Sequence, residues 1–127
     1  MVKQTINLSP HVTIYKFPIT AISAIATRIS GVYLSGIFVG YGISRGIGLD
    51  IDRRYKQLTG YTKSMVDYSL VAPLTYHSLS GIRHFVWDKY PSLLNNNHVA
   101  KSSYLLFGTS IGTTIMIERY LNSKSQE

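Results

Sequence analysis

Residues 76–88 read YHSLSGIRHFVWD and close an apolar run that begins near Met65. A run of this length is sufficient to cross a bilayer as a helix. Ionisable side chains are costly at the end of such a span, so a cluster of them indicates a functional site. His77 and His84 are seven residues apart, close to two helical turns, and therefore project from one helical face with Gly81 between them.

The two histidines cannot ligate the same metal ion, because about 10 Å separates them along the helix. If His77 ligates iron, the second ligand has to come from another helix. Gly81 leaves the backbone bare one turn after His77, as a flat macrocycle lying against the helix requires, and Arg83 and His84 are placed to meet its propionates. The alternative is that His77 only hydrogen-bonds a carbonyl within a helix bundle, which is the commoner role of a lone membrane histidine. The complete cluster favours a cofactor.

The composition favours a single membrane domain, residues 1–127. Charged residues make up 15% of the chain, which is low for a soluble domain of this length and indicates contact with lipid. The chain has no cysteine, so it forms no disulfide and holds no iron–sulfur cluster by itself. The net charge of +7 is spread over the tail and connections, which argues against nucleic acid as a partner.

Hydropathy and turn residues predict an all-α membrane protein with three transmembrane helices. The N-terminal segment resembles neither a secretory signal nor a transit peptide, so we expect a mature chain or one made in the compartment where it inserts. Lys and Arg do not decide the orientation, since residues 45–64 hold five of them and the opposite side holds four. The expected segments are an N-terminal tail at 1–17 and spans at about 19–44, 65–87 and 102–120.

Arg28 is the only charge inside the first span and lies in a stripe of small residues that includes Ala21, Ala24 and Gly31. Stripes of this kind are packing faces between membrane helices. An arginine at this depth needs an anion, such as a carboxylate, a lipid phosphate, a haem propionate or the oxygen of a quinone. The alternative is that its side chain reaches the nearby headgroups.

These segments resemble the cytochrome b anchor subunit of succinate dehydrogenase. Residues 77–88, in the pattern H-x-x-x-G-I-R-H-F-x-W-D, are similar to the signature of that family's second helix, and residues 9–22 are similar to its entry into the first helix. Arg28, Ser30 and Gly31 match the family's first-helix motif Ser-x-x-His-Arg-x-Ser/Thr-Gly.

Two positions of that motif differ here, because Ala24 replaces the family serine and Thr27 replaces the histidine. The resemblance implies a haem b site and a ubiquinone site, and the hydroxyls of Ser23 and Thr27 are the nearest substitutes for the missing side chains. The implied haem contacts are His77 as axial ligand, and hence the one metal ligand, with His84, Arg83 and Arg28 at the propionates. The implied quinone contacts are Arg28, Thr27, Ser23 and Asp88.

The function implied by the resemblance is that of a membrane anchor of succinate:quinone oxidoreductase, with no succinate oxidation of its own. Such a subunit passes electrons from the iron–sulfur subunit to ubiquinone and assembles with the flavoprotein subunit and a second membrane anchor. The mitochondrial inner membrane is the implied location, with a bacterial inner membrane as the alternative. Three other functions stay open: a fumarate reductase anchor, a cytochrome b-type carrier of another complex, and a purely structural membrane subunit without haem.

Overall fold

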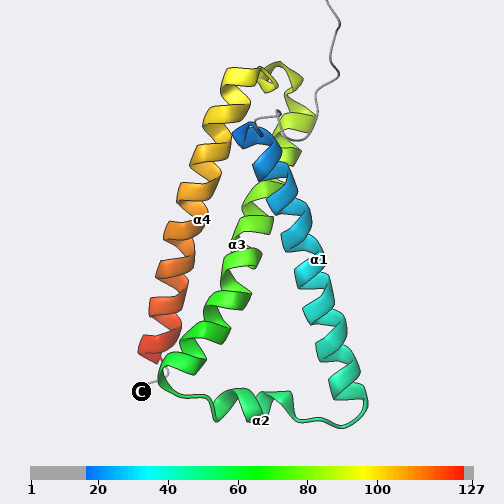
Figure 1. Ribbon diagram of the computed structural model, residues 1–127, viewed down its shortest axis with the longest axis vertical. Helices are drawn as coiled ribbons and strands as arrows, with labels where there is room; N and C mark the ends of the chain where they lie inside the picture. The colour runs from blue at the N-terminus through cyan, green and yellow to red at the C-terminus, as the bar shows by residue number, and fades with distance from the viewer. Residues whose placement is uncertain (1–16, 125–127) are drawn as a thin grey trace, which may run out of the picture.

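The computed structural model describes residues 17–124, and all regular secondary structure in that part of the chain is helical. The N-terminal tail, with the sequence pattern at residues 9–16, lies outside the described residues. The elements, shown in Figure 1, are α1 (Ile19–Gly46), α2 (Ile51–Lys56), α3 (Gly60–Lys89), the short 3-10 helix η1 (Pro91–Leu93) and α4 (Asn96–Lys124).

Proline and glycine set the main boundaries of these helices. The carbonyl of Pro18 accepts the first helical bonds of α1, from the backbone N–H groups of Ala21 and Ile22 at 3.0 and 3.2 Å. Gly48 has a φ of +83°, a conformation that only glycine adopts easily, and turns the chain from α1 into α2. The expected spans 19–44, 65–87 and 102–120 fall within α1, α3 and α4.

The three long helices form a wedge that α2 closes at its wide end (Figure 1). α3 and α4 lie side by side, whereas α1 meets α3 at the narrow end and diverges from it toward α2. Every side-chain hydrogen bond between α1 and α3 in the described residues comes from the N-terminal part of α1, residues 23–30. The narrow end is therefore where the two helices position side chains against each other.

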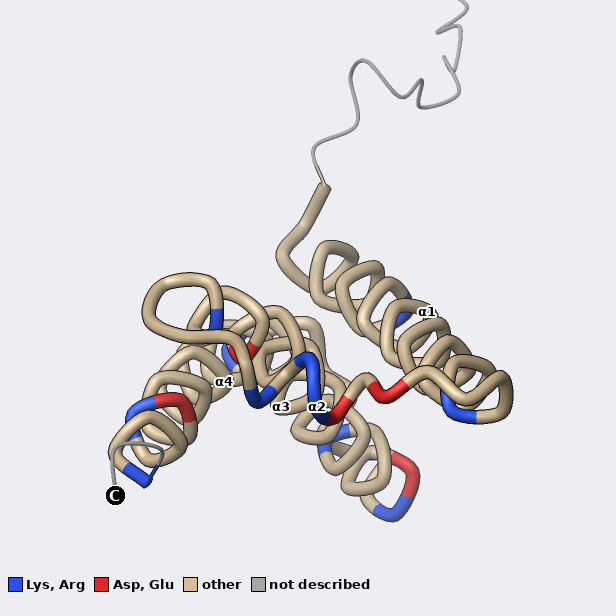
Figure 2. Tube along the Cα trace, turned by 90° about the horizontal axis from the view of Figure 1, so that it is seen from below, with Lys and Arg blue, Asp and Glu red and all other residues tan. Residues whose placement is uncertain are grey.

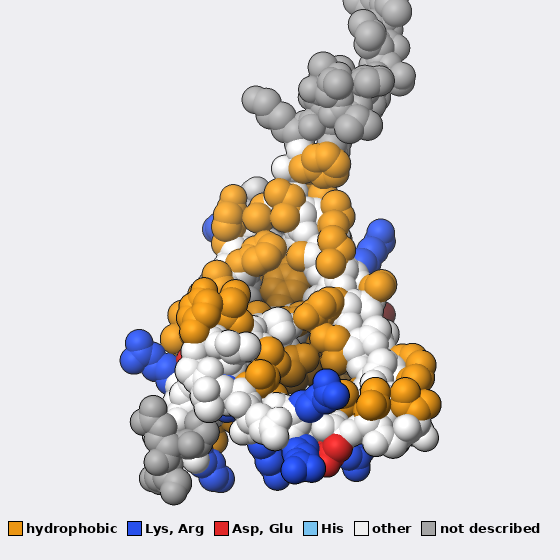
Figure 3. Space-filling model, turned by 60° about the horizontal axis from the view of Figure 1, so that its bottom comes forward, with side chains coloured by type: hydrophobic (Ala, Val, Ile, Leu, Met, Phe, Trp, Pro, Cys, Tyr) orange, Lys and Arg blue, Asp and Glu red, His pale blue; other side chains and the backbone are white. Residues whose placement is uncertain are grey.

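The interior of this bundle is polar and its surface is apolar. Two hydrophobic residues, Tyr76 and Leu106, are buried among the described residues, whereas the other buried side chains are polar or charged: Ser23, Ser30, Asp67, Thr75, Ser80, Ser103, Ser110, Thr114 and Glu118. Phe38 and Val32 are 80% and 76% exposed, and apolar side chains cover much of the face seen in Figure 3. Such a distribution is costly in water and is the one expected for helices that face lipid.

Hydropathy alone identifies fewer spans than the three that the sequence predicts. Within residues 17–124, α1 is the one helix long and apolar enough to cross a bilayer by length and composition. α3 and α4 carry more polar residues, but the structure turns many of them inward, as with Ser80 and Thr114. Figure 2 shows that charges gather at α2 and the adjoining helix ends.

Candidate functional site

Three hydroxyl side chains of α1, those of Ser23, Thr27 and Ser30, face α3 at the narrow end of the wedge; we call them the hydroxyl row. Their positions differ by four and three residues, so they lie along one side of the helix. Thr27 Oγ1 lies 2.6 Å from Ser80 Oγ of α3, and Ser30 Oγ donates to the Thr27 carbonyl at 2.8 Å. The row therefore joins the two helices by polar contacts rather than by apolar packing.

His77 lies against the end of the hydroxyl row. Its Nδ1 atom is 3.2 Å from Ser30 Oγ and 3.2 Å from the Thr27 carbonyl oxygen. A carbonyl oxygen can only accept, so Nδ1 is the protonated nitrogen in this arrangement. In the neutral ring, Nε2 then carries the free lone pair, and it has no hydrogen-bond partner among the described residues. The imidazole is thus held at one nitrogen and open at the other, as metal-ligating histidines are.

Gly31 allows the imidazole to approach α1 this closely. A Cβ atom at this position would lie 2.8 Å from His77 Cε1, closer than real Cβ contacts. Gly81, one turn from His77 on α3, behaves differently, because a Cβ there would meet nothing within 4 Å. The backbone at Gly81 is therefore bare on the outside of the bundle, where it leaves room for a flat group from outside the chain.

Arg83 points into the bundle and links all three long helices. Its two terminal nitrogens donate to Ser103 Oγ of α4 at 3.0 Å and to Ser23 Oγ of α1 at 2.9 Å. The guanidinium carbon lies 4.5 Å from the centroid of the Trp87 ring, and Nε is buried without a partner in the described residues. The terminal nitrogens are engaged with hydroxyls, so a role of Arg83 at a propionate stays a prediction, for which Nε is the open donor.

Arg28, His84 and Asp88 are exposed and are not brought together by this chain alone. Arg28 makes no hydrogen bond or ion pair with a described residue, and the His84 ring meets Trp87 edge to face at 5.6 Å. Their predicted roles at a quinone or at propionates therefore need a neighbouring group from outside the chain.

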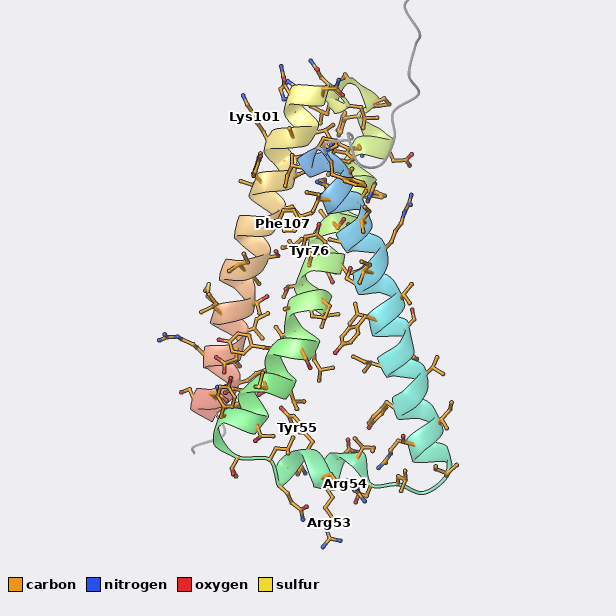
Figure 4. All side chains as sticks on the ribbon, viewed as in Figure 1. Arg53, Arg54, Tyr55, Tyr76, Lys101 and Phe107 are labelled. Atoms are coloured by element: carbon orange, nitrogen blue, oxygen red, sulfur yellow. The ribbon has the colours of Figure 1, made fainter. Side chains whose placement is uncertain are left out.

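Tyr76 and Phe107 contribute to this site and were missed by the sequence reasoning. The Tyr76 hydroxyl donates to the Ser23 carbonyl at 3.0 Å, and its ring stacks on Phe107 of α4 with centroids 5.1 Å apart (Figure 4). Both residues fix the helices around His77. The available signal was the position of Tyr76 directly before His77 in a helix otherwise rich in small polar residues.

A second polar cluster lies at the wide end. Asp67 is buried, pairs with Lys63 of the same helix at 2.9 Å and accepts a short hydrogen bond from the Tyr55 hydroxyl of α2. This bond, and then burial, raise the pKa of Tyr55 above its usual value of 10.0. Glu118 of α4 is also buried and accepts from Tyr68. The cluster tethers α2 and joins α3 to α4.

The donor set fits one protein ligand to a haem iron rather than a complete metal site. No group of three His, Cys, Asp or Glu residues in the described part of the chain is placed to hold a metal ion. His77 offers one open nitrogen beside a bare backbone at Gly81. These features would suit a haem held by His77 together with a ligand from outside the described residues.

Known proteins match this chain over most of its length. The family model described as the succinate dehydrogenase/fumarate reductase transmembrane subunit matches residues 2–117. The mitochondrial succinate dehydrogenase cytochrome b560 subunit of Mus musculus is 37% identical over 90 residues, which are 64% of this chain and 52% of the mouse protein. The corresponding protein of Dictyostelium discoideum is 32% identical over 102 residues, 77% of this chain and 53% of that protein.

The chain thus spans about half the length of these two curated relatives. A succinate dehydrogenase cytochrome b560 subunit of Marchantia polymorpha is 37% identical over 91 residues, 64% of this chain and 66% of the relative. The resemblance first noted at residues 77–88 is therefore confirmed at the level of the family, because the family model covers all three of the segments that suggested it. The chain belongs to the succinate dehydrogenase/fumarate reductase transmembrane subunit family.

Proposed function

We propose that this chain is the membrane-anchor cytochrome b subunit of a succinate:quinone oxidoreductase in the mitochondrial inner membrane. In this role it spans the bilayer with α1, α3 and α4, binds haem b through His77 and helps form the site where ubiquinone is reduced. The observation that carries the proposal is the state of His77, whose Nδ1 is held by α1 while Nε2 remains open.

The haem, when bound, supplies a one-electron carrier next to the quinone site. The chain's contribution is to hold the His77 ring at Nδ1, to leave the backbone bare at Gly81 and to pack lipid-facing helices around both. His84, which is exposed near the end of α3, is available to a propionate.

Arg28 is the residue of this chain best suited to a quinone oxygen. It is exposed on α1, next to Thr27 of the hydroxyl row, and no described residue neutralises it. In a site of low dielectric constant its charge would stabilise negative charge that develops on the quinone oxygen. Asp88, exposed at the end of α3, would relay protons to the reduced quinone. Ser23 and Thr27 bind side chains of α3, so we expect them to hold the part of α1 that carries Arg28 in place against α3.

The proposal requires partners. The second imidazole would come from a second membrane anchor, because His84 is two turns from His77 on the same helix, and His11 and His98 lie outside the predicted spans. Electrons would arrive from an iron–sulfur subunit that docks at the membrane surface with the flavoprotein subunit. This chain has no cysteine to hold a cluster itself.

The test is the reduced-minus-oxidised optical spectrum of the purified complex. A b-type α band is expected from the parent, and the His77→Leu variant should lose or displace it while the chain still inserts with its apolar surface intact. His98→Leu serves as the control, because His98 is exposed near the start of α4 and has no place in the proposed haem site. An unchanged band in His77→Leu would refute the assignment of His77, and no band in the parent complex would favour the structural alternative.

A further inference from the structure

We infer that Ser30 and Gly31 together form a seat that fixes the tautomer and the ring orientation of His77, and thereby set the reduction potential of the haem bound there. The inference rests on the proposed function, because it takes His77 to be the haem ligand. It assigns to two α1 residues a positioning role on a ligand that belongs to α3.

Ser30 provides the polar half of the seat. Its side chain is 7% exposed, donates to the Thr27 carbonyl at 2.8 Å and lies 3.2 Å from His77 Nδ1. Because the serine hydrogen goes to the carbonyl, its oxygen faces Nδ1 as an acceptor. The Nδ1 proton is therefore shared between two acceptors, the Ser30 hydroxyl and the Thr27 carbonyl. The Thr27 carbonyl, which can only accept, excludes the tautomer in which Nε2 carries the proton and cannot bind a metal through that atom.

Gly31 provides the steric half. The nearest three atoms to a Cβ built there all belong to the His77 ring: Cε1 at 2.8 Å, Nδ1 at 3.4 Å and Nε2 at 3.7 Å. The ring therefore rests on the α1 backbone along its edge. Any side chain at position 31 would push the ring outward and turn Nε2 away from its present direction.

The seat has an electronic consequence as well as a geometric one. Acceptors at the far nitrogen make an imidazole a stronger donor to the metal, which favours the oxidised iron. Removal of the Ser30 hydroxyl leaves the Nδ1 proton with one acceptor, so the potential should rise. Displacement of the ring by a side chain at position 31 should instead weaken the bond to iron.

The experiment compares five variants in the complete complex with its partner subunits: Ser30→Ala, Ser30→Thr, Gly31→Ala and the controls Ser35→Ala and Gly36→Ala. Ser35 is exposed on the same helix, and a Cβ at Gly36 meets nothing within 4 Å. Three quantities are measured: haem per complex, the midpoint potential by optical redox titration, and the low-temperature EPR signal of the oxidised haem.

We expect Ser30→Ala to raise the midpoint potential, shift the EPR signal and weaken haem retention by roughly tenfold, as is common for the loss of an outer-shell partner. Ser30→Thr keeps the hydroxyl and should restore the parent values. Gly31→Ala should convert the haem to an open-site spectrum or lower its content severalfold. Both controls should match the parent.

The outcomes separate this inference from the function on which it rests. A parent complex without a b-type spectrum, or one that keeps it in His77→Leu, overturns the haem assignment itself. A parent with His77-dependent haem whose potential and EPR signal are unchanged in both Ser30→Ala and Gly31→Ala overturns the seat and leaves the function standing. If Gly31→Ala does not assemble, the comparison of Ser30→Ala with Ser30→Thr decides the test alone. A midpoint potential that falls in Ser30→Ala would also refute the inference.

Discussion

Two tyrosine–aspartate bonds tether α2 to the long helices, and they form a natural matched pair. The Tyr55 hydroxyl donates to the buried Asp67 of α3, whereas the Tyr41 hydroxyl of α1 donates to the exposed Asp52 of α2 at 3.0 Å. Both carboxylates also have a cation, Lys63 for Asp67 and an arginine for Asp52. The side chain of Asp67 is 3% exposed and that of Asp52 is 52% exposed, so the two bonds differ mainly in burial.

We predict that Tyr55→Phe loosens α2 and that Tyr41→Phe does not. A hydrogen bond to a charged group contributes about 1.5–3 kcal/mol when buried, and Tyr55 is only half-buried, so we expect a loss of about 2 kcal/mol. Because 1.4 kcal/mol is about a factor of ten, local opening of α2 should become roughly 30-fold more frequent. The bond at Asp52 is open to solvent, where such contacts contribute little.

Trypsin measures this opening directly, because α2 contains Arg53 and Arg54, and Arg53 extends away from the bundle (Figure 4). When opening is fast relative to cleavage, the cleavage rate follows the population of the open form. In the detergent-solubilised complex, cleavage within α2 should be roughly 30-fold faster in Tyr55→Phe and close to the parent rate in Tyr41→Phe. Equal rates in the two variants, or a faster rate in Tyr41→Phe, would refute the claim that burial of the carboxylate decides the strength of the tether.

Three further outcomes are expected. The bond to Asp67 raises the pKa of Tyr55, so the stabilisation from this hydroxyl is fully present below pH 10 and is lost as the pH rises through the raised pKa. The difference in melting temperature between the parent complex and Tyr55→Phe should therefore shrink only above pH 10. Gly81→Ala should lower the haem content of the complex although the alanine meets nothing within this chain, and Gly36→Ala should leave it unchanged, as optical spectra would reveal. Arg28→Leu should reduce quinone reduction far more than electron transfer from succinate to a soluble dye, and equal losses would mean that Arg28 acts in assembly instead.

The sequence predicted the helices well because their boundaries depend on local chemistry. Pro18 fixes the start of α1, and the polar connection 45–64 contains the short helix α2. The spans 65–87 and 102–120 were predicted from their position between connections, and the helices α3 and α4 extend beyond these ranges because polar turns at their ends remain helical. Local signals of this kind do not depend on how the helices pack.

The candidate site was predicted only in part, because its geometry depends on packing between helices. The sequence context of His77 marked it as a candidate ligand, but the tautomer of its ring depends on Ser30 and the Thr27 carbonyl. A different rotation of α1 would have placed both of these groups elsewhere. Arg83 was expected at a propionate, yet its terminal nitrogens contact hydroxyls of α1 and α4, since a serine occurs at the right height on each helix. Ser23 and Thr27 contact α3, and their expected contact with a quinone stays a prediction.

The inverted polarity of the bundle explains why a hydropathy window finds α1 and passes over α3 and α4. A window averages all faces of a helix, whereas any helix that spans a bilayer within a bundle meets lipid with its outer face alone. Pairs such as Thr75 with Thr114, 2.8 Å apart between α3 and α4, place two polar side chains inside the bundle. Hydrogen bonds of this kind between membrane helices average about 0.6 kcal/mol, so each adds modest stability, but each also removes a polar group from the outer surface of the bundle. The polar residues that lower the hydropathy of α3 and α4 are in this way the residues that hold the bundle together. A helix can therefore face lipid on its outer side with an average hydropathy that would not identify it alone.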